Sequence, residues 1–275
     1  MTQESKISRI HISLPAIQDI AVKGVRRTAV FMGLGVNAAT NPEFTQYELT
    51  NFTHLRFIEQ NPSESTLKNF QDEFGRWIVS NGIRELIETF CVFLDEINLA
   101  CLWIDVISKQ TSSDNINKTN SNFRRLGLEK KFSSLLHAFG IKIDQAEYLI
   151  SINQVRNCLT HRRGIVGIED CINTEELIVK WKGIDIYIQN PSSEKIPLFP
   201  LREGGVLLEK DGKINMEIKE RTKTVPLKSI ITFTPKELAE ICHYVLLVTD
   251  EVVKATEDYA IKQGIPIIKS EKVAT

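Results

Sequence analysis

Residues 154–166 read Gln-Val-Arg-Asn-Cys-Leu-Thr-His-Arg-Arg-Gly-Ile-Val. Apolar residues recur at spacings of three and four up to and within this stretch, which predicts an amphipathic helix. That helix would begin near Asp144, with Glu147 at the capping-box position. Gly164 would end it in the left-handed conformation, which leaves His161, Arg162 and Arg163 in its last turn. The expected buried stripe consists of Leu149, Ile152, Val155 and Leu159.

Potential chemistry is concentrated in the same stretch. Asn157 and His161 are four residues apart and share a helix face, so the amide can orient the imidazole ring. Arg156 and His161 are five residues apart and diverge by about 140° on a helix of about 3.6 residues per turn. A single helix therefore cannot bring both side chains to one atom, whereas two copies of it could.

The pattern Arg-Asn-x-x-x-His near a helix end, followed by basic residues and Gly-x-Val, resembles the RxxxxH motif of the HEPN superfamily. A looser similarity covers residues 74–95. The resemblance implies a helical domain that dimerises with its two motifs facing a common cleft. It implies catalytic roles for Arg156, Asn157 and His161. We further expect substrate contacts from Thr160, Arg162 and Arg163.

The activity implied by this resemblance is metal-independent RNA cleavage. A 2′-hydroxyl would attack the adjacent phosphate and leave a cyclic phosphate, in a defence, toxin or stress role. The expected partners are RNA, a second copy of the chain, and an antitoxin or regulatory protein. Two alternatives stay open. One is a non-catalytic HEPN-like dimer that binds RNA, nucleotide or a protein; in the other, Arg156 and His161 only cap carbonyls at a helix end.

Composition restricts the function classes further. The 275 residues carry 34 basic and 35 acidic side chains, so RNA binding would need a local basic patch. The five cysteines form no CxxC pair, which argues against a disulfide framework and a zinc site and favours reduced thiols in the cytoplasm. We expect no metal and no cofactor. No apolar run reaches the roughly 18 residues that predict a membrane span.

The expected fold is mainly α, a HEPN-like helical bundle with a small antiparallel β insertion before the C-terminal helix. Residues 1–43 have no clear role, because a strand-like start at Ile10 precedes a stretch that fits a glycine-weakened helix. Residues 44–169 form the helical domain. Residues 170–231 form the β insertion, and residues 232–275 the helix that closes the bundle. Thr234, Pro235 and Glu237 have the spacing of a helix start.

Finer predictions follow from local patterns. Residues 65–108 are helical with a break or kink at Asn81-Gly82, residues 111–122 are a mobile loop, and residues 127–138 are a helix. The β insertion contains two hairpins, one turning at Lys182-Gly183 and one at residues 210–213. Its basic residues fit either a surface that guides RNA or a charged edge that resists aggregation. They are Lys180, Lys182, Lys210 and Lys213.

Overall fold

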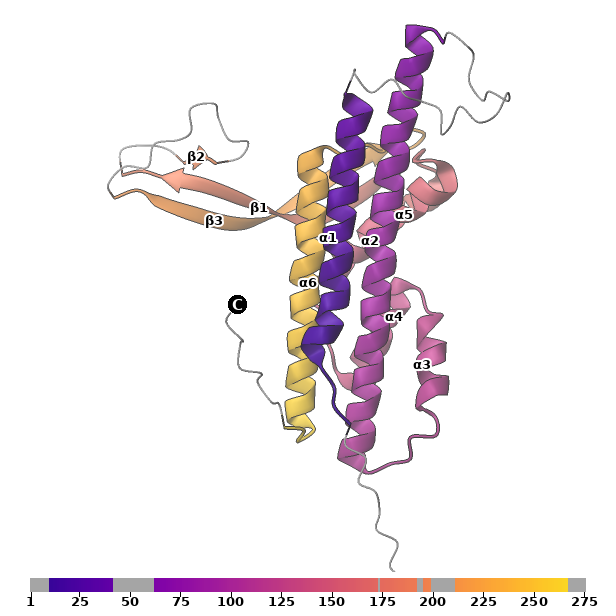
Figure 1. Cartoon of the computed structure of the whole chain (residues 1–275), viewed down its shortest axis with the longest axis vertical. Helices are drawn as coiled ribbons and strands as arrows, with labels where there is room; N and C mark the ends of the chain where they lie inside the picture. The colour runs from indigo at the N-terminus through magenta and orange to yellow at the C-terminus, as the bar shows by residue number, and fades with distance from the viewer. Residues whose placement is uncertain (1–9, 42–61, 173, 192–194, 199–210, 267–275) are drawn as a thin grey trace, which may run out of the picture. The chain divides into compact units, whose positions relative to one another are not determined.

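A computed structural model of the chain describes residues 10–41, 62–172, 174–191, 195–198 and 211–266 (Figure 1). These residues form six α-helices and one three-stranded antiparallel sheet, which precedes the last helix. The prediction of a mainly α fold with a small antiparallel insertion is therefore confirmed. Within these ranges no helix combines the length and the apolar character that a membrane crossing demands.

The chain divides into two compact units. The first draws on the described residues of Met1–Gly24, Glu88–Ala146 and Leu247–Thr275, and the second on those of Val25–Ile87 and Glu147–Leu246. Three long helices pass from one unit into the other, so each contributes a part to both cores. They are α1 (Leu14–Thr40), α2 (Glu64–Lys109) and α6 (Pro235–Lys262).

The first unit packs α3 (Ile116–Arg124) and α4 (Leu128–Phe139) with the second half of α2. The rings of Phe90 on α2 and Phe132 on α4 lie 6.2 Å apart, edge to face. Lys131 is buried, and it forms an ion pair with Asp95 and donates to the Phe123 carbonyl at 3.0 Å. A buried charge is costly unless it is paired and hydrogen-bonded, as Lys131 is here.

The mobile loop predicted for residues 111–122 is wrong, because α3 occupies much of this segment. Ile116, Asn120 and Phe123 form the buried face of α3. Asn98 on α2 donates to the Asn120 side-chain oxygen at 2.9 Å, inside the unit. The polar composition concealed a short helix whose buried polar residue finds its partner on another element.

The second unit contains α5 (Ala146–Arg162), a short 3₁₀ helix η1 (Ile168–Asp170) and the sheet. The strands β1 (Glu176–Gln189), β2 (Ile196–Pro197) and β3 (Lys213–Pro226) are arranged in the order β2-β1-β3. β1 pairs with β3 along its whole length, from Glu176 opposite Pro226 to Gln189 opposite Lys213 (Figure 1). Leu177, Val179 and Trp181 of β1 are buried.

The hairpin predicted at Lys182-Gly183 is wrong, because both residues lie inside β1 and pair with β3. Gly183 leaves room for side chains from β3 and α6, because a Cβ there would lie 2.5 Å from Arg221 Nε and 2.6 Å from Glu240 Oε2. Of the second predicted hairpin, residues 213–218 lie in β3, whereas residues 206–210 lie outside the described residues.

Helix α2 runs without interruption through Asn81-Gly82, so the predicted break is absent. A Cβ at Gly82 would lie 2.2 Å from Cγ of Met32 on α1, so this glycine also serves close packing. Of the ambiguous N-terminal segment, residues 14–40 form α1, and Ile10 lies before that helix without strand structure, whereas residues 1–9, 42 and 43 lie outside the described part.

The remaining helix predictions are confirmed in their main features. α4 ends at Gly140, which has a φ of 68°. At the start of α6, Thr234 Oγ1 accepts from the Glu237 N–H at 3.2 Å, and Glu237 accepts from the Thr234 N–H at 2.7 Å. This is the predicted capping box. α5 begins at Ala146, later than predicted, and the Asp144 carboxylate forms an ion pair with Lys142 in place of a helix cap.

Candidate functional site

Helix α5 carries the candidate residues and is fixed through its apolar face. Leu149, Ile152, Val155 and Leu159 are all buried, as predicted. Cys158 is buried too, and burial followed by the nearby Asp170 carboxylate raises the pKa of its thiol to about 12. Because the thiolate is the reactive form of cysteine, Cys158 is a packing residue and no nucleophile.

Two polar contacts attach α5 to the sheet. The Ser151 hydroxyl accepts from the Lys180 N–H at 3.0 Å. Its single hydrogen is shared between the Tyr148 carbonyl at 2.8 Å and the Lys180 carbonyl at 3.1 Å, so it contacts both backbone groups of one β1 residue. Tyr148 donates its phenol hydrogen to Glu220 Oε2 at 2.5 Å, and this bond raises the pKa of the phenol to about 12. The position of α5 therefore depends on β1 and β3.

The end of α5 differs from the prediction by one residue. The helix ends at Arg162, and Arg163 already has a left-handed φ of 52°. Gly164 follows with a φ of 79°, and its N–H donates to the Cys158 carbonyl at 3.2 Å. The left-handed conformation expected at Gly164 is confirmed, whereas Arg163 lies outside the last helical turn.

A short antiparallel bridge follows directly. Ile165 pairs with Ile230. The Ile231 N–H donates to the Gly164 carbonyl at 2.9 Å, and the Val166 N–H donates to the Ser229 carbonyl at 3.0 Å. The segment between β3 and α6 therefore lies beside the end of the motif.

Arg162 is held by carboxylates. Its Nε donates to Asp170 Oδ2 at 2.8 Å, its Nη2 bonds Asp170 Oδ1, and its Nη1 lies 3.2 Å from Glu169 Oε1. Asp170 is only 4% exposed, and it also accepts from the Gly167 N–H at 2.9 Å. This bidentate pair connects the end of α5 to η1 and neutralises a guanidinium that we had expected to bind substrate.

The three residues of the expected catalytic set lie near the end of α5 in different environments. Arg156 and Asn157 are half-buried, and Arg156 Nη1 donates to Asn157 Oδ1 at 2.9 Å. His161 and Thr160 are exposed. Between these described residues no hydrogen bond joins Asn157 to the His161 ring, so the amide contacts the arginine instead.

The other histidines lack a comparable group of chemical neighbours. His137 and His243 each place Nδ1 near a carbonyl of their own helix, at 2.6 Å from Ser133 and 2.9 Å from Ala239. His11 is exposed before α1, and His54 lies outside the described residues. The described residues contain no group of three His, Cys, Asp or Glu side chains that could hold a metal ion.

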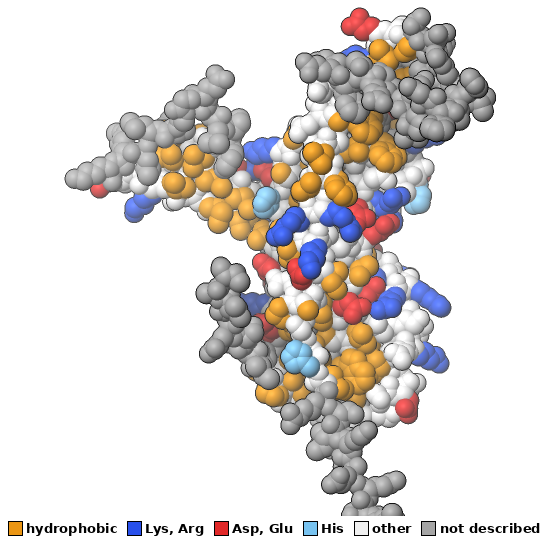
Figure 2. Space-filling model, in the orientation of Figure 1, with side chains coloured by type: hydrophobic (Ala, Val, Ile, Leu, Met, Phe, Trp, Pro, Cys, Tyr) orange, Lys and Arg blue, Asp and Glu red, His pale blue; other side chains and the backbone are white. Residues whose placement is uncertain are grey.

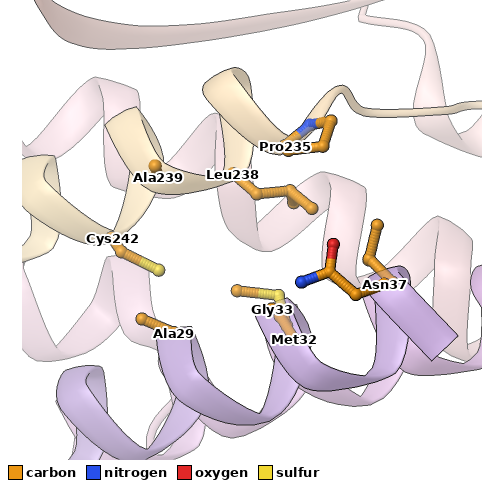
Figure 3. Close-up of a pocket in the computed structure, with 9 residues that line it drawn as sticks. Ala29, Met32, Gly33, Asn37, Pro235, Leu238, Ala239 and Cys242 are labelled. Carbon is orange, nitrogen blue, oxygen red and sulfur yellow. The ribbon is translucent and has the colours of Figure 1, made fainter.

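A pocket of about 230 Å³ lies between α1 and α6 within the second unit (Figure 3). Met32 and Cys242 point into it from opposite helices, and Asn37 supplies an amide at its side. Its lining contains no acidic or basic side chain and no residue of residues 154–166. An apolar pocket of this kind does not supply groups for proton transfer.

On the face shown in Figure 2, lysine and arginine side chains are interspersed with acidic ones. This agrees with the balanced composition of 34 basic and 35 acidic residues. Hydrophobic side chains are exposed over the sheet, where β3 contributes Ile214, Met216 and Ile218.

Comparison of the chain with protein-family models, with curated proteins and with solved structures found no match in any of the three. The functional argument therefore rests on the geometry at the end of α5.

Proposed function

We propose that the protein is a metal-independent endoribonuclease of the HEPN type, acting as a homodimer. The observation that carries the proposal is the end of α5, where an exposed imidazole at His161 follows a half-buried guanidinium at Arg156. An imidazole can move a proton and a guanidinium can stabilise a phosphate. A defence, toxin or stress role, with an antitoxin or regulatory partner, belongs to the same proposal.

The proposed reaction is attack of an RNA 2′-hydroxyl on the adjacent phosphorus. The new O2′–P bond forms as the P–O5′ bond breaks, which leaves a cyclic phosphate and a free 5′-hydroxyl. His161 takes the proton from the nucleophile or gives one to the leaving oxygen, since imidazole titrates near neutrality. Arg156 binds the phosphate and stabilises the charge that develops on it.

Asn157 has a different role from the one its spacing suggested. Its side-chain oxygen accepts from Arg156 Nη1 at 2.9 Å. We therefore assign Asn157 to holding the arginine, and no longer to orienting His161. Of the expected substrate contacts, Arg163 and Thr160 keep that role, whereas the Asp170 pair makes Arg162 a support for the helix end.

Chemistry as well as spacing supports the proposed dimer. Arg156 and His161 diverge by about 140° on one helix, so a composite site would combine groups from two copies of α5. Two imidazoles can also divide the acid and base roles, which one imidazole cannot fill at the same moment. A two-fold axis relating the two helices would satisfy both requirements.

The test is RNA cleavage in EDTA. Wild type should cut RNA into fragments with a cyclic phosphate and a 5′-hydroxyl, and a 2′-deoxy substitution at the scissile nucleotide should block the cut. His161→Ala and Arg156→Ala should each lose at least about a hundredfold in rate. His137→Ala and His243→Ala are matched controls. Each removes an exposed histidine whose Nδ1 is within hydrogen-bond distance of a carbonyl of its own helix.

Equal RNA cleavage rates for wild type and His161→Ala would contradict the catalytic role of His161. If wild type binds RNA but leaves it intact, the protein belongs to the non-catalytic class. Light scattering should give a dimer at micromolar concentration, and a monomer there would contradict the composite site.

A further inference from the structure

Three residues other than glycine have a left-handed φ in the described part of the chain. They are Gln110 at 51°, Arg163 at 52° and Lys228 at 66°. This conformation is unfavourable for residues with a Cβ, and glycine adopts it without the steric cost. Gln110 follows α2 in the first unit, whereas the two basic residues lie in the second unit next to the candidate site.

Arg163 and Lys228 stand at opposite ends of the same short bridge. Arg163 directly precedes Gly164, whose carbonyl accepts from Ile231. At the other end, the Lys228 N–H donates to the Val166 carbonyl at 2.9 Å. Lys228 is also the third residue of a turn closed by the Ser229 N–H and the Pro226 carbonyl at 3.0 Å. A positive φ at that turn position favours glycine.

Neither basic side chain is explained by packing. Both are exposed, and neither has an ion-pair partner among the described residues, in contrast to Arg162 with Asp170 and Glu169. Arg163 and Lys228 are thus exposed basic residues without an ion-pair partner among the described residues, and both have unfavourable backbone angles. Unfavourable backbone conformations that persist in a fold are a reason to look for a function.

We propose that Arg163 and Lys228 form a pair of phosphate contacts that bind the RNA backbone beside the reactive phosphate. The inference rests on the proposed function and adds Lys228 to it, a residue that is 65 positions from Arg163 in the sequence. Ile165 and Ile230 lie between them and are 48% and 49% exposed, so they offer apolar surface for a ribose or base. The pair positions RNA and takes no part in proton transfer.

The experiment exploits the shared backbone angle. Arg163→Gly, Lys228→Gly and Gln110→Gly each remove the same steric cost, so each should raise the thermal midpoint by about 2–4 °C. RNA binding is measured in a His161→Ala background, which keeps a single-stranded RNA intact. A plot of log affinity against log salt concentration has a negative slope. Loss of one phosphate contact should reduce the magnitude of this slope by about 0.7. Arg163→Gly and Lys228→Gly should show this loss, and Gln110→Gly should not.

Arg163→Gln and Lys228→Gln complete the design, because they remove the charge and keep the backbone preference of a residue with a Cβ. They should reduce the magnitude of the slope of log affinity against log salt without raising the thermal midpoint. If the variants at 163 and 228 keep the slope of the Gln110→Gly control, the phosphate pair is wrong even though RNA cleavage stands. If wild type neither binds nor cuts RNA, the proposed function fails, and the pair fails with it.

Discussion

Gly82 lies in the middle of α2, although glycine in a helix interior is about 1 kcal/mol less favourable than alanine. The reason is Met32, whose Cγ and Sδ would lie 2.2 and 2.3 Å from a Cβ at this position. Gly82→Ala should therefore destabilise the protein by about 1–3 kcal/mol in urea unfolding, because overpacking outweighs the gain in helix propensity.

Two companion variants test this explanation of Gly82. Adding Met32→Ala should recover part of the loss, which a double-mutant cycle would measure as a coupling energy. Gly33→Ala on α1 is the matched control, since a Cβ there meets nothing within 4 Å. It should be neutral or stabilising by up to about 1 kcal/mol. Stabilisation by Gly82→Ala itself would contradict the packing argument.

Asp185 supplies a prediction on pH. The hydrogen bond from Arg221, followed by the contact with Lys219, holds the pKa of this carboxyl below its ordinary value of 3.8. The lowered pKa contributes stability above pH 3.8, and this contribution disappears as the pH falls through the lowered value. Asp185→Asn should thus be less stable than wild type at pH 6, and the difference should shrink in more acidic solution. A difference that is constant across urea titrations at several pH values would rule out this linkage.

At the scale of elements, the hydroxyl of Ser151 on α5 contacts the backbone of Lys180 on β1. Ser151→Ala removes the partner of both backbone groups of Lys180. Leaving part-buried backbone groups unsatisfied should cost about 1–3 kcal/mol in urea unfolding. Ser133→Ala on the exposed face of α4 is the matched control and should stay within about 0.5 kcal/mol of wild type. Equal stability of the two variants would show that water replaces the hydroxyl at Lys180.

Elements with local signals were predictable from the sequence. The capping box of Thr234 and Glu237 involves residues three apart, and the buried stripe of α5 repeats within one helix. Elements that depend on distant partners were not. Asn120 on α3 is bonded to Asn98, which is 22 residues away, and Gly183 lies in a strand where Arg221 and Glu240 occupy the space that a Cβ would need.

The candidate site divides in the same way. The group of Arg156, Asn157 and His161 is visible in the sequence, because its members are close together. The bond from Arg156 to Asn157 and the pairing of Arg162 with Asp170 depend on side-chain conformations in the folded protein, which sequence spacing does not determine. Lys228 gave no signal at all, since its proximity to the motif depends on the bridge between Ile165 and Ile230.

At the scale of the whole molecule, each of the two units contains at least one buried cysteine, whose reaction with a thiol reagent would show when that unit opens. Cys101 belongs to the first unit, Cys158 and Cys242 belong to the second, and all three are buried. Burial raises the pKa of each thiol, to about 12 for Cys158 and about 11 for Cys242. A thiol reagent should therefore modify the half-buried Cys91 and Cys171 in the native protein well before these three.

Thiol labelling at increasing urea concentration would show whether the two units unfold together. Because α1, α2 and α6 pass through both units, we expect Cys101 and Cys158 to become reactive over the same range of urea. Mass spectrometry of the labelled peptides would give the two transitions separately. Transitions separated by more than about 1 M urea would show that the units open independently.

The discontinuous composition of the two units also affects how the protein is made. Both cores include part of α6, whose residues follow all the other described helices in the chain. Translation proceeds from the N-terminus at about 5–20 residues per second, and domains generally fold as units once their chain has emerged. Neither unit can close its core until α6 leaves the ribosome. The apolar faces of α1 and α2 must wait for it, and during that time they are natural binding sites for a nascent-chain chaperone.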